Sequence, residues 1–150
     1  MNFPLSSKAL SGVLIALLFF DAVSSFAGAV MAIFFNGAGV PLEVLAGTWF
    51  QSSFLVLGLI LGIILGGTHT VAAIAMLTQR RWALLASAVA GFAMLIWNFT
   101  ELAIIGYSWL QSVYFGFGAL ELILVLAVLG IAPAIVSPRQ GRAALVNGAS

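Results

Sequence analysis

The sequence has no cysteine and very little charge. Of its 150 residues, five are Lys or Arg, four are Asp or Glu, and one is histidine. Without cysteine, the chain cannot form disulfides, thiolate metal sites or a covalent c-type haem attachment. A soluble domain carries about 25% charged residues, whereas this chain has 6%, too few to cover a water-facing surface. A net charge of +1 also offers no basic stripe to a phosphate backbone, so we expect no nucleic-acid partner.

Long apolar runs take the place of the missing charge. A transmembrane helix needs about 20 mostly apolar residues, and residues 9–35, 51–77, 82–106 and 112–132 all satisfy this requirement. Pro133 ends the last run because proline cannot continue a helix. The sequence therefore predicts an all-α membrane protein. Its single domain, residues 1–136, is a bundle of four transmembrane helices in the lipid bilayer, followed by a tail of residues 137–150.

The basic residues all lie on one side of this predicted topology. The loops expected on the other side, residues 36–50 and 107–111, contain none. By the positive-inside rule both termini are cytoplasmic, and the loop of residues 36–50 faces outward. The basic residues are Lys8, Arg80, Arg81, Arg139 and Arg142.

Two short motifs have alternative interpretations. The start of the chain resembles a signal peptide with a small-residue cleavage site near Ala29. Asp21 and the apolar residues that follow it favour a retained span instead. Residues 98–100, "NFT", match the glycosylation motif, but they fall inside a predicted span, so we interpret them as a chance match.

Four ionisable side chains fall inside the predicted spans. Asp21, His69 and Glu121 lie at similar depths near mid-membrane when depth is counted at about 1.5 Å per residue, and Glu101 lies close to the outer interface. A charge at the bilayer centre costs about 3 kcal/mol or more, so such groups normally face protein or water. These four residues are the candidate binding or proton-handling residues.

Each of the four also lies on the small or polar face of its own helix. At about 100° per residue, His69 falls within the arc of Gly58, Gly62 and Gly66, a helix-packing stripe that lets a neighbouring backbone approach closely. We therefore expect one polar interior, which either fixes the helices by hydrogen bonds or handles protons or a ligand. One histidine per chain predicts no metal site, although two copies in a dimer could pair their histidines.

The sequence also resembles a known group of proteins over residues 40–122. The resemblance lies in "LAGTWF" (residues 45–50), the "GG" of the second span, and a pattern across the third and fourth spans. It is similar to small, uncharacterised four-helix membrane proteins of bacteria, mostly actinobacterial, and more weakly, in size and helix count, to DoxX-like proteins. That group often has proline where this chain has Ser112. The resemblance implies a multi-pass protein of the bacterial plasma membrane and no particular activity. The pattern comprises Trp97, Glu101, residues 108–111, Tyr114, Phe115 and Gly118.

Three functions are compatible with these features. Short loops, the glycine stripe and the lack of a nucleophile–base arrangement favour a non-enzymatic subunit or partner in a larger membrane assembly, or a homo-oligomer. The alternative is a small proton-coupled transporter, or a binder of a lipophilic molecule such as a lipid or quinone, at Asp21, His69 and Glu121. A membrane enzyme with a redox cofactor is the least supported, so we expect no catalytic residues and no cofactor.

Overall fold

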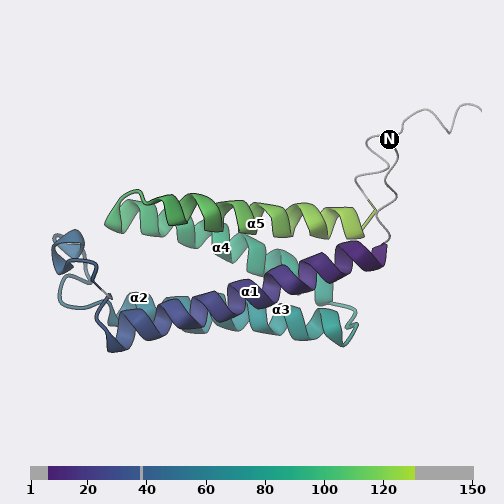
Figure 1. The fold of residues 1–150 in the computed structure, drawn as a ribbon, viewed down its shortest axis with the longest axis horizontal. Coiled ribbons are helices and arrows are strands. Elements are labelled where there is room, and N and C mark those ends of the chain that lie inside the picture. Colours follow the sequence, from purple (N-terminus) through teal and green to yellow (C-terminus); the bar gives the residue numbers. More distant parts are fainter. Residues whose placement is uncertain (1–6, 38, 131–150) are drawn as a thin grey trace, which may run out of the picture.

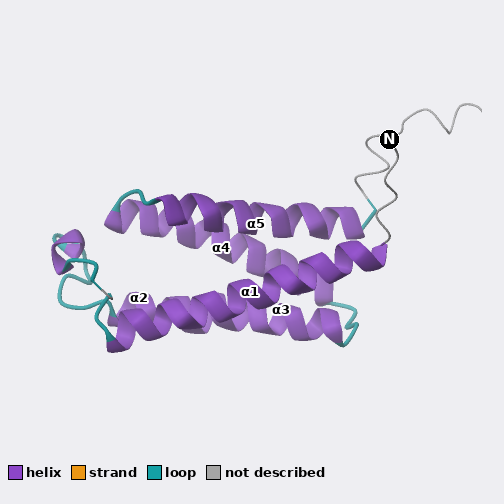
Figure 2. Ribbon diagram, viewed as in Figure 1, coloured by secondary structure: helices purple, strands orange, loops and turns teal. Residues whose placement is uncertain are grey.

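The protein folds as a bundle of helices. The computed structural model describes residues 7–37 and 39–130, and these residues contain helices and loops but no strand (Figures 1 and 2). Four helical segments are long and apolar enough to cross a membrane. They are α1 (Ser7–Phe34), a continuous segment of α2 (Leu55–Leu59), η2 (Ile60–Gly66) and α3 (Gly67–Leu77), then α4 (Ala83–Ile105) and α5 (Trp109–Val128).

Successive helices run in opposite directions, as Figure 1 shows. The start of α1, the hairpin after α3 and the end of α5 lie at one end of the bundle, which places Lys8, Arg80 and Arg81 there. The loop between α1 and α2 lies at the other end. Helices α4 and α5 pack along each other, and α1 packs against η2, α3 and α5. Pro133, Arg139, Arg142 and the predicted tail lie outside the described residues.

The outward faces of the bundle are apolar. Large side chains on all four segments are at least 60% exposed, which is the reverse of a water-soluble helix bundle. Such a surface is compatible with a membrane, because an apolar surface of this extent would aggregate in water. Examples are Phe19, Ile63, Leu85, Ile96 and Ile123.

The second span begins at Leu55, four residues later than predicted. The chain before it is held in turns: a short 3-10 helix, η1 (Leu42–Leu45), is followed by Thr48, whose hydroxyl donates to the Leu45 carbonyl at 2.7 Å. The Asn36 side-chain oxygen accepts the Phe54 N–H at 3.3 Å and ties the end of α1 to the start of α2. These local bonds keep apolar residues of this segment out of the helix.

The fourth span begins earlier and ends earlier than predicted. Ser108 and Gln111 form a capping box, in which each side chain bonds the other residue's backbone, so that α5 begins at Trp109 rather than at residue 112. At its other end α5 stops at Val128, and Gly130 follows with φ +73°, a conformation typical of a helix C-terminus. The predicted helix therefore extends past the observed end at Val128, and its last two residues, 131 and 132, lie outside the described residues.

The predicted glycine stripe packs against α1. A Cβ atom on Gly58 would lie 2.9 Å from the Ala32 Cβ and 3.2 Å from the Ala29 carbonyl oxygen. A Cβ on Gly62 would lie 3.0 Å from the Ala29 Cβ, and one on Gly66 would lie 2.9 Å from the Phe26 ring. Since these distances are shorter than ordinary contacts, only glycine allows α1 and the second span to approach this closely.

Candidate functional site

Three of the four candidate residues meet in the interior of the bundle. Asp21 comes from α1, His69 from α3 and Glu121 from α5, and each side chain is fully buried. One ligand atom from each residue lies within 4.8 Å of the other two. We call these three residues the triad. They have the similar depth that residue counting predicted, and the fold supplies the convergence that a single sequence leaves open.

The orientation of the His69 ring follows from one hydrogen bond. His69 Nδ1 lies 2.7 Å from the backbone carbonyl oxygen of Leu65. A carbonyl oxygen only accepts, so Nδ1 carries the hydrogen and donates it. In the neutral ring the other nitrogen, Nε2, then has a free lone pair. Nε2 lies 3.3 Å from Glu121 Oε2, but the two atoms do not have hydrogen-bond geometry.

The segment before His69 is π-helical and explains the polar run "GGTHT". Over η2 the backbone widens, and the Gly67 N–H reaches the Gly62 carbonyl, five residues back. Thr68 and Thr70 donate their hydroxyl hydrogens to the carbonyls of Ile64 and Gly66 at 2.6 and 2.7 Å. Side chains thus add donors to backbone carbonyls of the helix.

Single π turns occur frequently at functional sites, and this one supplies the carbonyl that orients His69. Neither the turn nor the role of the Leu65 carbonyl was predicted from the sequence. The only sequence signal was the pair of glycines followed by two threonines, since a backbone carbonyl belongs to every residue type.

The triad is short of hydrogen bonds. Neither carboxylate oxygen of Asp21 or Glu121 has a hydrogen-bond partner, and neither does His69 Nε2. Lys8 is the only lysine or arginine within the four described spans, and it precedes Asp21 by about 20 Å of helix. In the part of the chain that the structure describes, the two buried carboxylates have one imidazole and no Lys or Arg beside them, so they require compensating positive charge, because an unpaired charge in a dry interior is costly. A proton or a metal cation can provide that charge here.

The triad forms a polar layer between two apolar clusters. The first cluster takes residues from all three helices of the triad, whereas the buried residues of the second come from η1, the start of the second span, η2 and α4, nearer the α1–α2 loop. The first cluster comprises Leu14, Leu18, Ala72, Ala73, Ala90, Leu124 and Val125. The second comprises Leu45, Phe54, Leu57, Leu65, Met94 and Trp97.

Glu101 does not join the triad. It lies in the last turns of α4 and is only partly buried. It lines a cavity of about 330 Å³ near the α1–α2 loop, together with Gly37, Phe54 and Trp97. The fourth candidate is therefore separated from the other three, as its predicted depth implied, and it is the natural control residue for experiments on the triad.

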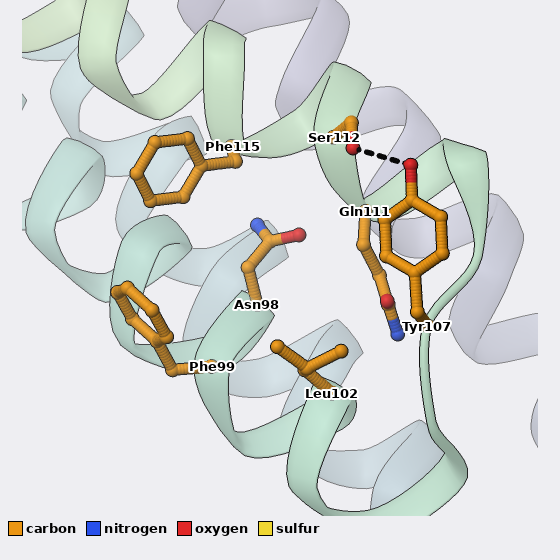
Figure 3. Close-up of a pocket in the computed structure, with 7 residues that line it drawn as sticks. All are labelled: Asn98, Phe99, Leu102, Tyr107, Gln111, Ser112 and Phe115. Carbon is orange, nitrogen blue, oxygen red and sulfur yellow. Dashed lines mark hydrogen bonds between the residues drawn. The ribbon is translucent and has the colours of Figure 1, made fainter.

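A second polar feature lies between α4 and α5, in the cleft of about 200 Å³ that Figure 3 shows. Asn98 projects into this region, donates its side-chain N–H to the Met94 carbonyl at 2.9 Å and leaves its oxygen without a partner. The Tyr107 hydroxyl bonds the Ser112 hydroxyl at 2.9 Å. Asn98 is buried within α4, which fits the interpretation of residues 98–100 as a chance match to the glycosylation motif.

No family model, curated protein or solved structure matches this chain. The chemistry of the triad is accordingly inferred from its own residues and distances.

Proposed function

We propose that the chain is a multi-pass protein of the bacterial plasma membrane that binds and releases protons at the triad, as a small proton-coupled transporter does. One observation carries this proposal. His69 Nε2 and Glu121 Oε2, both with lone pairs when the ring is neutral, lie 3.3 Å apart in the fully buried interior. Two acceptors at this distance repel unless a proton or another cation lies between them.

A purely structural network is the main alternative, and the unmade hydrogen bonds count against it. Buried polar groups with a purely structural role normally have hydrogen-bond partners, because a buried group without a partner lowers stability by about 1–3 kcal/mol. In the triad, five side-chain atoms have no hydrogen-bond partner. Such a cost is typical of sites at which a bound species completes the bonding during function.

The protonation of the triad depends on few groups. The helices packed around His69 bring Asp21 from α1 and Glu121 from α5, and α4 has Glu101 as its one carboxylate, near the far end of the helix. Uptake and release of protons by the triad therefore involve these two carboxylates and one imidazole.

Proton movement can be measured in liposomes that contain the purified protein and a pH-sensitive dye. With an imposed pH difference as the driving force and a mixture of cations on the opposite side for exchange, we expect protein-dependent dissipation of the pH difference. Asp21→Asn and Glu121→Gln should reduce the flux by about 10-fold or more, since one carboxylate is removed in each, and Glu101→Gln should retain it.

Absence of protein-dependent flux in the wild type would contradict the proposal. Wild-type flux in Asp21→Asn and Glu121→Gln would contradict it as well. Each variant is first checked for a monodisperse peak in detergent and for equal insertion into the liposomes. The hypothesis of a subunit or partner in a larger assembly, or of a homo-oligomer, stays a prediction, because the structure is that of a single chain.

A further inference from the structure

We infer that Asp21, His69 and Glu121 together bind one divalent transition-metal ion, and that this ion is the species exchanged for protons. The exchange rests on the proposed function, whereas binding of the metal does not. One imidazole nitrogen and two carboxylates are available from three helices, with one ligand atom of each within 4.8 Å of the others.

The donor set indicates the class of metal. Imidazole suits zinc, iron, copper and nickel, whereas calcium and magnesium prefer sites made of oxygen alone. Carboxylates extend the range to manganese, and no cysteine is present to select a softer ion. A site of one histidine and two carboxylates is therefore expected to take zinc or a neighbouring divalent metal of the first transition row.

The second partner of the histidine supports the assignment independently. Histidines that bind metals almost always donate their other ring N–H to a carboxylate, a carbonyl or water, which fixes the ring and leaves the ligating nitrogen unprotonated. His69 donates Nδ1–H to the Leu65 carbonyl at 2.7 Å, and Nε2 is left free at 3.3 Å from a Glu121 oxygen. The π-helical segment η2 contains this carbonyl, so the local backbone presents the ligand.

The distances suit a small cation. Zinc binds nitrogen and oxygen at about 2.0–2.2 Å, so two ligand atoms around a tetrahedral ion lie about 3.4 Å apart. His69 Nε2 and Glu121 Oε2 are 3.3 Å apart. Asp21 is close enough to complete a three-ligand side of the site after a small side-chain movement, and both of its oxygens are free of hydrogen bonds.

Charge balance links the metal to protons. Two carboxylates and a neutral imidazole carry a charge of −2, which either one divalent ion or two protons neutralise. Binding of the ion and release of two protons therefore leaves the net charge of the triad unchanged, and the interior never has to hold an uncompensated charge. The reverse step releases the metal as two protons return.

The test is a titration of the metal-depleted protein in detergent with zinc chloride, in competition with a chromogenic chelator. We expect one zinc per chain for the wild type. His69→Gln and Asp21→Asn should weaken binding by about 100-fold or more, because loss of a direct ligand should cost at least as much as loss of an outer-shell partner. Glu101→Gln is the control and should bind zinc as the wild type does.

Measurements on the wild type alone keep the inference testable if a variant does not fold. Cobalt(II) in place of zinc should give visible absorption bands of a nitrogen–oxygen site, which zinc bleaches. Zinc affinity should also fall as the pH is lowered, since protons compete for the same ligands. Zinc at less than one equivalent per chain, or equal binding by the wild type, His69→Gln and Asp21→Asn, would overturn the inference.

The metal site and proton transport can fail separately. Tight zinc binding without proton flux in liposomes that have zinc on one side would support the site and contradict transport. Proton flux without zinc binding would leave the proposed function in place and overturn the metal. Zinc uptake that drives protons in the opposite direction, and that is lost in His69→Gln but retained in Glu101→Gln, would support the exchange itself.

Discussion

At the scale of single residues, the side chains of the triad are fully buried although several of their polar atoms have no hydrogen-bond partner. Glu121 is fully buried and neither of its oxygens has a hydrogen-bond partner. The His69 nitrogen that faces it is an acceptor when Nδ1 donates to Leu65. A group that donates a hydrogen from position 121 would resolve the conflict without any bound cation, and glutamine has such a group in nearly the same volume.

Glu121→Gln is therefore expected to keep or raise the stability of the metal-free protein while it reduces the proton flux. The new amide N–H can donate to His69 Nε2, and one hydrogen bond contributes about 0.5–1.5 kcal/mol. Thermal unfolding in detergent with a chelator present should give a Tm at or above that of the wild type. Glu121→Ala, which supplies no donor and leaves a void, should lower it. Equal loss of stability in both variants would contradict this account of the pair.

At the scale of helices, the position of the triad depends on the close approach of α1 and the second span. The glycine stripe lets α1 lie against η2, and His69 follows directly on that stripe. The contact is asymmetric: Gly58 is crowded by Ala32 and Ala29, whereas Gly67, nine residues later, has nothing within 4 Å of an added Cβ. Gly58 therefore permits a close helix contact and Gly67 does not, although both belong to the same continuous helical segment.

Gly58→Ala is expected to lower the free energy of unfolding by about 1–3 kcal/mol, the cost of inserting a methyl group into a tight contact. Gly67→Ala should be neutral or raise it by about 0.5–1 kcal/mol, because alanine favours the helix and meets no neighbour there. Unfolding in mixed detergent, followed by circular dichroism, compares the two variants. Similar effects of both substitutions would show that the stripe is not a close contact.

At the scale of the whole molecule, the topology separates the loops between the two ends of the bundle. Lys8, Arg80 and Arg81 lie at one end, and the loop that contains Ser52 lies at the other. The positive-inside rule then predicts that the basic end is cytoplasmic. Since the chain has no cysteine, a single introduced thiol reports its side of the membrane without background.

We expect Ser52→Cys to react with a membrane-impermeant maleimide in intact cells, and Thr78→Cys to react only after the membrane is permeabilised. Both positions are exposed in loops or at a helix end, so access to the reagent is set by the bilayer. Gel shifts of the labelled protein provide the measurement. The opposite pattern would invert the orientation, and labelling of both from outside would contradict a four-span topology.

Much of the fold follows from composition and spacing, but the helix ends do not. Four apolar runs and their short connections were sufficient to predict four spans. The start of α2 was predicted too early, because an apolar run does not reveal that Asn36 and Thr48 hold the preceding residues in turns. Hydropathy measures what tolerates lipid, whereas a helix boundary depends on specific hydrogen bonds.

The sequence by itself determined that the chain needs an apolar solvent, and that Asp21, His69 and Glu121 occupy similar depths, since both follow from side-chain chemistry and a constant rise per residue. Only the tertiary structure decided that these three side chains face one another and that His69 turns Nε2 toward Glu121. Rotation of each helix about its axis is set by packing against its neighbours, and the π-helical turn before His69 changes that rotation in a way that a regular helical period cannot represent.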